Sequence, residues 1–202
     1  MSVNLAKVLK VGYKSKEKQG KVMNRYGYKI DKDLSNDNQQ VYYNPNEKKL
    51  LYNVAGTHNL SDVGTDVYLG LGKLKDTKRY KQADETLKKA KAKYGVSNAT
   101  ISGHSLGATI AQGIAKPEDK EYSLNAGYTI GQKTKGGNQH NYRTQGDVVS
   151  LLGSNSKNLQ TFGKKENTSV LGSFLKGGII GVGQNLLKSH KPETIKKQHI
   201  FV

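Results

Sequence analysis

The chain has no cysteine and no tryptophan, and only three of its 202 residues are proline. The absence of cysteine excludes disulfide bonds, cysteine-ligated zinc and thiol catalysis. No apolar stretch is long enough to cross a bilayer as a helix. The first residues lack the apolar core and the small-residue cleavage pattern of a secretory signal. We therefore expect a cytoplasmic protein without a signal peptide or membrane span.

Arginine is also scarce, whereas lysine is abundant. Arg25, Arg79 and Arg143 are the only arginines, although the chain has 33 basic and 16 acidic residues and a net charge of +17. A lysine-rich surface attracts polyanions in general, such as nucleic acid or anionic lipid headgroups. Lysine is less suited than arginine to bidentate recognition, so nucleic-acid binding would be non-specific. A solvated basic surface without any partner is the alternative.

Hydrophobic periodicity predicts one α/β domain over residues 1–202. The predicted strands alternate with helices, which indicates a mostly parallel central sheet flanked by helices and preceded by an amino-terminal hairpin. A polar, basic stretch without predicted structure follows the first helix, up to about Asn38, and residues 153–168 are expected to form a loop. The predicted helices are 3–11, one from about 61, 75–95 and 105–116, and the predicted strands are 40–43, 49–55, 98–104, 121–129 and 141–152.

The segment TISGHSLGATIAQ places Ser105 between two glycines, after a β-favouring run and before an amphipathic helical pattern. This order is typical of a nucleophile elbow, in which a strand stops at the nucleophile and a helix starts at once. Gly103 and Gly107 would allow the turn to close, and the helix N-terminus would place N–H groups beside a developing oxyanion. The pattern predicts Ser105 as a nucleophile, and a structural glycine-rich turn is the alternative.

A serine nucleophile needs a base, and the base needs an orienting acid. In the elbow fold these residues follow in the order serine, acid, histidine. Asp147, beside the apolar run VVSLL, is the predicted acid, and a simple turn aspartate is the alternative. Two histidines follow it. His190 is the predicted base because it heads a polar turn after an apolar segment, and His199 is the alternative base.

An oxyanion hole requires two N–H donors. The amide of Leu106, directly after the nucleophile, is one predicted donor. The segment LLYNVAGTHNLSDVGTD consists of an apolar strand, a Gly-Thr pair and a helix start. This arrangement favours the amide of Thr57 as the second donor. We expect His58 to shape this loop and His104 to pack inside the elbow.

Three segments, VAGTHNLSDVGTD, GHSLGATIA and GDVVSLL, together resemble the class 3 lipases, the fungal-type triacylglycerol lipases of the α/β-hydrolase superfamily. The resemblance covers about residues 40–152 and implies the same triad and the same oxyanion donors. The chain departs from the family pattern at Ala55, where arginine is usual, and at Val63, where tryptophan is common. Its lysine- and asparagine-rich, cysteine-free composition is also similar to that of lipase-like proteins of large DNA viruses, which would place it in host cytoplasm or a virion.

These features predict a serine ester hydrolase that acts on lipid acyl esters through an acyl-enzyme, without a metal or an organic cofactor. The same triad would also serve a thioesterase, a peptidase or an acyltransferase. The non-enzymatic alternative is a lipase-fold protein that binds lipid or nucleic acid through its basic surface or forms part of a virion. The glycine-interrupted apolar segment 169–188 is expected to be a core helix, a flap or peripheral contact with an anionic membrane, or an irregular loop.

Overall fold

The computed structural model describes residues 2–57, 71–127, 138–145, 147, 159–162, 192, 195 and 198–202. Within them the chain forms one sheet, whose strands lie side by side in chain order. The elements are α1 (Leu5–Val11), α2 (Lys16–Asn24), β1 (Lys29–Ile30), β2 (Gln39–Asn44), β3 (Lys49–Val54), η1 (Leu71–Asp76), α4 (Lys78–Tyr94), β4 (Thr100–His104), α5 (Leu106–Ile114), β5 (Lys120–Leu124), β6 (Gln139–Thr144) and β7 (Leu159–Phe162).

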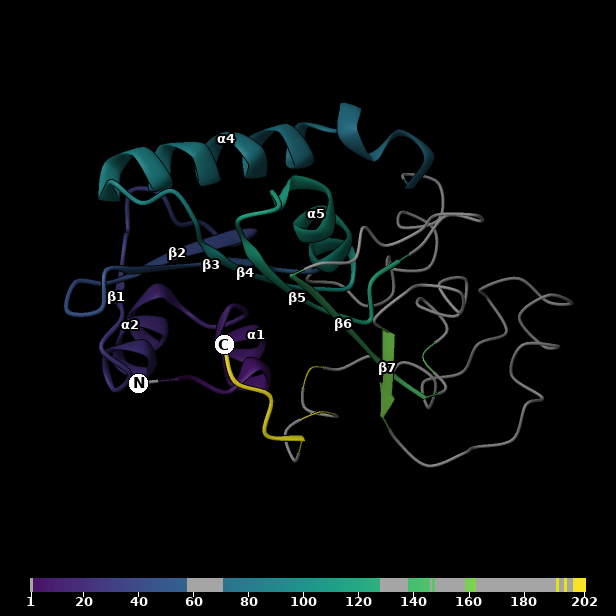
Figure 1. Cartoon of the computed structure of the whole chain (residues 1–202), viewed down its shortest axis with the longest axis horizontal. Coiled ribbons are helices and arrows are strands. Elements are labelled where there is room, and N and C mark those ends of the chain that lie inside the picture. The colour runs from purple at the N-terminus through teal and green to yellow at the C-terminus, as the bar shows by residue number, and fades with distance from the viewer. Residues whose placement is uncertain are drawn as a thin grey trace, which may run out of the picture.

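The sheet is antiparallel at its beginning and parallel afterwards. β1, β2 and β3 pair antiparallel, whereas β3 to β7 pair parallel with their chain neighbours. Helices α4 and α5 lie on one side of the sheet and α1 and α2 on the other (Figure 1). This is the predicted architecture, including the hairpin. Because parallel strands end at one edge, the residues that follow β3, β4, β5 and β6 meet there.

Helix α4 confirms the helix that the sequence predicted over residues 75–95. The Thr77 side chain accepts a hydrogen bond from the Tyr80 N–H (3.2 Å), and Gly95 closes the helix with φ 62. Thr77 is thus the N-cap of α4, and Gly95 is its left-handed C-cap. The apolar face at spacings of three and four packs on the sheet, where it joins residues of β3, β4 and α5 in the largest core cluster; its fully buried members are Ala83, Leu87 and Ala90.

Two stretches that were expected to lack regular structure contain elements. The polar stretch before Asn38 contains α2 and β1, and β7 lies inside the expected loop 153–168. Helix α2 buries only Gln19 and Met23, so its apolar periodicity is too weak to predict it. β7 has no fully buried side chain, which removes the alternation that marks a strand. The predictions for a helix from about 61 and for the segment 169–188 lie outside the described residues.

The two ends of the described chain lie beside each other below the sheet (Figure 1). Asn4 bridges to Phe201, and the Leu5 N–H donates to the Ile200 carbonyl (2.8 Å). These residues adjoin a core cluster between α1 and the face of β5 and β6. Across the described ranges, every helix is too short or too polar to pass through a bilayer.

Candidate active site

Ser105 forms the turn between β4 and α5 with an unusual backbone conformation. Its φ is 56° and its ψ is −127°. A positive φ is sterically costly for a residue with a Cβ and is stored where the surrounding structure requires it. The Ser105 N–H donates to the Leu124 carbonyl at the end of β5 (3.0 Å). The side chain is buried, and its Oγ makes no hydrogen bond with a described residue. The predicted elbow geometry is therefore present at Ser105.

The two flanking glycines allow close packing of α5 against the strands. A Cβ at Gly103 would lie 2.5 Å from the Gly107 carbonyl oxygen. A Cβ at Gly107 would lie 2.5 Å from the Ala55 carbonyl oxygen and would overlap the Val54 carbonyl oxygen. These contacts are with backbone, which cannot rotate away. The G-x-S-x-G spacing thus has a steric cause at both glycines.

Replacing Gly107 with alanine is expected to lower the free energy of unfolding by about 1–3 kcal/mol, since the added methyl must displace the end of β3. The elbow and the loop after β3 would move apart, so Ser105 reactivity would fall as well. Urea denaturation measures the change in stability. Single-turnover labelling of Ser105 with a fluorophosphonate probe measures the change in reactivity. Gly95→Ala is the contrasting variant: its φ of 62° strains alanine, so stability should fall, but its added methyl meets no other element within 4 Å, and labelling should be unchanged in the folded protein. A stable, fully reactive Gly107→Ala protein would contradict this packing.

The loop after β3 lies directly against the elbow. A Cβ at Gly56 would lie 2.8 Å from the His104 carbonyl oxygen and 3.2 Å from the Ser105 Cβ. Thr57 follows at this point, and Leu106 begins α5. Within the described part of the chain, neither the Thr57 N–H nor the Leu106 N–H donates a hydrogen bond. The structure thus brings the loop that carries Thr57 beside Ser105. The role of the Thr57 and Leu106 amides as oxyanion donors stays a prediction.

Tyr13 joins this loop to the elbow. Its hydroxyl oxygen accepts a hydrogen bond from the Gly56 N–H (2.8 Å) and lies 2.9 Å from His104 Nδ1. Because the hydroxyl has one proton and its oxygen already accepts from Gly56, it can donate to the Nδ1 of a neutral imidazole. His104 therefore packs within the elbow, as predicted, and is held by a residue that no sequence pattern indicated.

Arg79 holds the same loop from the opposite side. Its guanidinium Nη2, from the first turn of α4, donates to the carbonyls of Ala55 and Gly56. Burial lowers the pKa of Arg79, although the side chain stays charged at neutral pH. The arginine that supports this backbone thus lies 24 residues after Ala55 in the chain. The scarcity of arginine in the sequence was the one signal that could have pointed to Arg79.

Replacing Tyr13 with phenylalanine is expected to reduce kcat about tenfold or more and to change KM little for a small soluble ester. The variant leaves the buried Gly56 N–H unpaired, which costs about 1–3 kcal/mol, and it frees the loop. Tyr26→Phe is the matched control, because it removes a hydroxyl that accepts from Lys7 near the surface. An unchanged kcat in Tyr13→Phe would show that the hydroxyl does not position the loop.

Asp147 lies at the same edge of the sheet as Ser105, two strands away. Its N–H donates to the Thr144 carbonyl at the end of β6 (3.0 Å), and the residue is buried. Asn125, after β5, fills the space between: its amide oxygen accepts from the Thr144 N–H (2.8 Å) and its N–H donates to the Tyr142 carbonyl (2.9 Å). Two strand spacings are roughly 10 Å, a gap across which two side chains can approach one imidazole.

The histidines are divided between described and undescribed parts of the chain. His190, the predicted base, and His58 lie outside the described residues. His199, the alternative base, is exposed beside the amino-terminal residues, with φ 50°, and makes no hydrogen bond to Ser105 Oγ. His140 is exposed and stacks on Tyr122, with 4.8 Å between ring centroids. The identity of the base therefore stays a prediction. No group of His, Asp or Glu side chains in the described ranges could hold a metal ion.

The mostly parallel sheet, the elbow after β4 and the helix behind it define an α/β-hydrolase-like fold. No protein-family model and no curated protein matches the chain.

Among solved structures, the chain is similar to the Lip2 lipase of Yarrowia lipolytica, with 15% identity, a TM-score of 0.43 and coverage of 61% of this chain and 60% of that one. It is also similar to the Rhizomucor miehei lipase in its propeptide complex, with 14% identity, a TM-score of 0.47 and coverage of 73% and 61%. A mutant form of MDLA from Penicillium cyclopium has 16% identity, a TM-score of 0.44 and coverage of 73% and 70%. The chain thus spans about three fifths of the first two lipases.

Proposed function

We propose that this chain is a serine hydrolase that cleaves acyl esters, with lipid esters as its substrates. The observation that carries the proposal is the backbone of Ser105, a non-glycine residue at φ 56° whose buried hydroxyl has no partner among the described residues. A structural turn would place glycine there, since glycine adopts this conformation without strain. A serine held in that conformation suits a nucleophile aimed at a substrate.

In the proposed reaction, the Ser105 Oγ attacks the ester carbonyl carbon and transfers its proton to His190. The carbonyl oxygen becomes an oxyanion that accepts hydrogen bonds from the Thr57 and Leu106 amides. The bond to the leaving alcohol then breaks, and His190 returns the proton to that alcohol. Water hydrolyses the acyl-enzyme by the same proton transfers in reverse roles. Asp147 orients the imidazole and stabilises its charged form.

Lipid esters are favoured over other acyl compounds by the resemblance of three sequence segments to class 3 lipases. The triad itself does not discriminate among esters, thioesters and amides. Product analysis with matched ester, thioester and amide substrates of one acyl chain would test this choice. Hydrolysis of the amide at a rate equal to that of the ester would contradict the lipid-esterase assignment and retain the nucleophile.

A fluorophosphonate probe tests the nucleophile directly. After labelling, trypsin releases a peptide that spans residues 94–120 and contains Ser97, Ser102 and Ser105. We expect fragmentation to place the label on Ser105, with the other two serines as internal controls in the same peptide. Folded protein without label, or with label spread over the three serines, would favour the non-enzymatic alternative of a basic lipid- or nucleic-acid-binding protein.

A further inference from the structure

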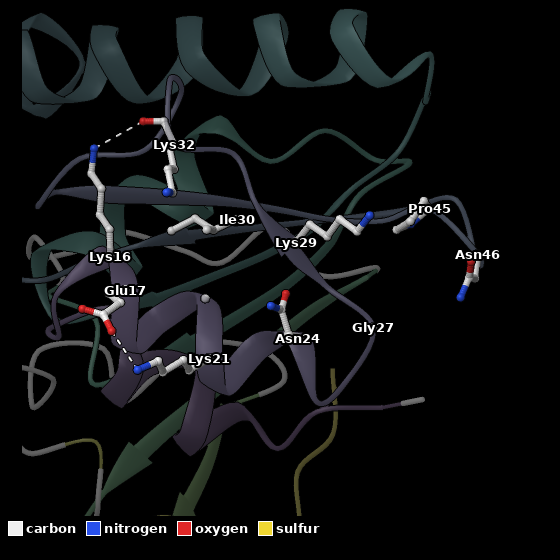
Figure 2. Close-up of a pocket in the computed structure, with 11 residues that line it drawn as sticks. Lys16, Glu17, Lys21, Asn24, Gly27, Lys29, Ile30, Lys32, Pro45 and Asn46 are labelled. Atoms are coloured by element: carbon white, nitrogen blue, oxygen red, sulfur yellow. Dashed lines mark hydrogen bonds and ion pairs between the residues drawn. The ribbon is translucent and has the colours of Figure 1, made fainter.

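A basic groove runs along α2 on the side of the molecule that carries the hairpin. It has a volume of about 700 Å³ and lies between α2, β1 and the turn that joins β2 to β3 (Figure 2). Four lysines line it: Lys16 and Lys21 from α2, Lys29 from β1, and Lys32 from the turn after β1. None of the described residues of the candidate active site lines the groove, and we treat its role as separate from the proposed hydrolysis.

Three of these lysines have no acidic partner among the described residues. Lys21 forms an exposed ion pair with Glu17 (2.7 Å). Lys16 Nζ donates to the backbone carbonyl of Lys32 (3.3 Å), and no carboxylate of the described chain pairs with Lys16, Lys29 or Lys32. Like charges around one hollow repel each other, so an anion bound among them is favoured.

Gly20 leaves space in the groove beside the lysines of α2. It lies in the middle of α2 and lines the groove. Glycine there weakens a helix, yet the fold does not demand it: its φ is not positive, and an added Cβ would meet only Ile30 Cγ2 at an ordinary 3.6 Å. Alanine would fit at this position. Because glycine has no side chain, the groove stays open at this position.

We propose that this groove binds clustered phosphate groups, carried either by a small soluble polyanion or by a phosphorylated lipid headgroup. Its volume is in the range of small-ligand sites. Lysine ammonium groups recognise charge density, whereas a bidentate phosphate site would use arginine. No aromatic side chain among the described residues lines the groove, so nucleobases would find no stacking surface there. These features favour the phosphates alone over nucleic acid.

The test is a calorimetric titration of the full chain with inorganic tripolyphosphate at about 0.15 M salt. We expect the triple variant Lys16→Gln, Lys29→Gln, Lys32→Gln to bind roughly tenfold or more weakly. The matched control removes the same charge elsewhere, through Lys75→Gln, Lys78→Gln and Lys81→Gln; these three lysines are exposed and unpaired in the described chain. The control should bind within about twofold of the unmodified chain. Equal losses in the two triple variants would overturn the proposal, because binding would then depend on net charge alone.

Gly20 variants separate a filled groove from a damaged fold. Gly20→Ala should keep tripolyphosphate binding and raise the unfolding temperature, since alanine favours the helix. Gly20→Gln should fold equally well and lose binding, because the longer side chain occupies the hollow. Unchanged affinity in Gly20→Gln would overturn the proposed location.

Vesicles distinguish the two sources of phosphate. Flotation with vesicles containing phosphatidylinositol bisphosphate, compared with phosphatidylserine vesicles of equal charge, tests the headgroup. Binding to the former that tripolyphosphate displaces assigns the groove to a lipid headgroup, whereas tripolyphosphate binding without vesicle binding assigns it to a soluble polyanion. A third outcome would overturn the proposal. If the chain binds a single-stranded oligonucleotide but does not bind tripolyphosphate, the groove would be assigned to nucleic acid instead.

Discussion

Ser105→Ala is expected to lower the rate of ester hydrolysis at least about 1,000-fold and to abolish fluorophosphonate labelling. The reason is chemical, because alanine lacks the oxygen that forms the acyl-enzyme. Alanine also requires the same strained turn, so the fold should be retained. Steady-state hydrolysis of a soluble ester and circular dichroism of the same samples measure both properties. A labelling rate that survives the substitution would contradict the assignment of the nucleophile.

Ser105→Gly is the matched variant, and it separates chemistry from strain. Glycine also lacks the nucleophile, so activity should be lost as fully as in Ser105→Ala. Glycine adopts φ 56° without a Cβ clash, so this variant should be more stable than Ser105→Ala by about 1 kcal/mol or more. Urea denaturation of the pair gives the difference. Equal stabilities would mean that the turn stores no strain at Ser105.

The elbow was predictable because its sequence and its geometry have one cause. Gly103 and Gly107 are required by backbone atoms within a few ångströms, and a strand and a helix must follow each other at Ser105. Local spacing therefore encodes the local structure. The supporting side chains have no such encoding: Tyr13 reaches Gly56 from 43 residues earlier, and Arg79 reaches it from 23 residues later. Only the packing of α1 and α4 on opposite faces of the sheet brings them together.

The strands also bury more polar side chains than their sequences suggest. Across β2, β3 and β4, Asn53 Nδ2 donates to Gln40 Oε1 (2.6 Å), and the Ser102 hydroxyl donates to Asn53 Oδ1 (2.9 Å), all within the core. A hydrophobic fraction of 34% is low for a domain with a core. These paired amides and hydroxyls explain how the interior is filled, because a buried polar group is tolerated when it is hydrogen-bonded. Hydrophobic periodicity alone therefore underestimates such strands.

Glu121 on β5 is a buried carboxyl side chain whose oxygens have no hydrogen-bond partner among the described residues. Neither carboxylate oxygen makes a hydrogen bond of good geometry with a described residue, and no described cation pairs with it. Burial raises the pKa of Glu121 well above its ordinary value, and the nearby Ser123 hydroxyl offsets only part of this effect. The folded chain therefore keeps Glu121 protonated at pH values where the unfolded chain ionises it.

This difference gives the second large expected effect, on stability. Above the ordinary glutamate pKa of about 4.3, the unfolded state releases a proton that the folded state retains. Each further pH unit then lowers the free energy of unfolding by about 1.4 kcal/mol, until the pH reaches the raised pKa of the folded state. Glu121→Gln removes this slope, because its amide does not ionise. Its stability relative to the unmodified chain should therefore rise with pH throughout that window.

The slope of stability against pH, rather than the stability at one pH, tests whether Glu121 stays protonated in the folded chain. An amide in place of a carboxyl can gain or lose contacts of its own, and such contacts shift stability equally at every pH. Glu118→Gln is the matched control, because Glu118 is exposed and lies 3.9 Å from Lys91; it should leave the slope unchanged. Parallel stability curves for Glu121→Gln and the unmodified chain, as the pH rises above the ordinary glutamate pKa of about 4.3, would show that Glu121 ionises as easily in the folded chain as in the unfolded one. In that case a partner for its charge must lie outside the residues described on β5 and its neighbours.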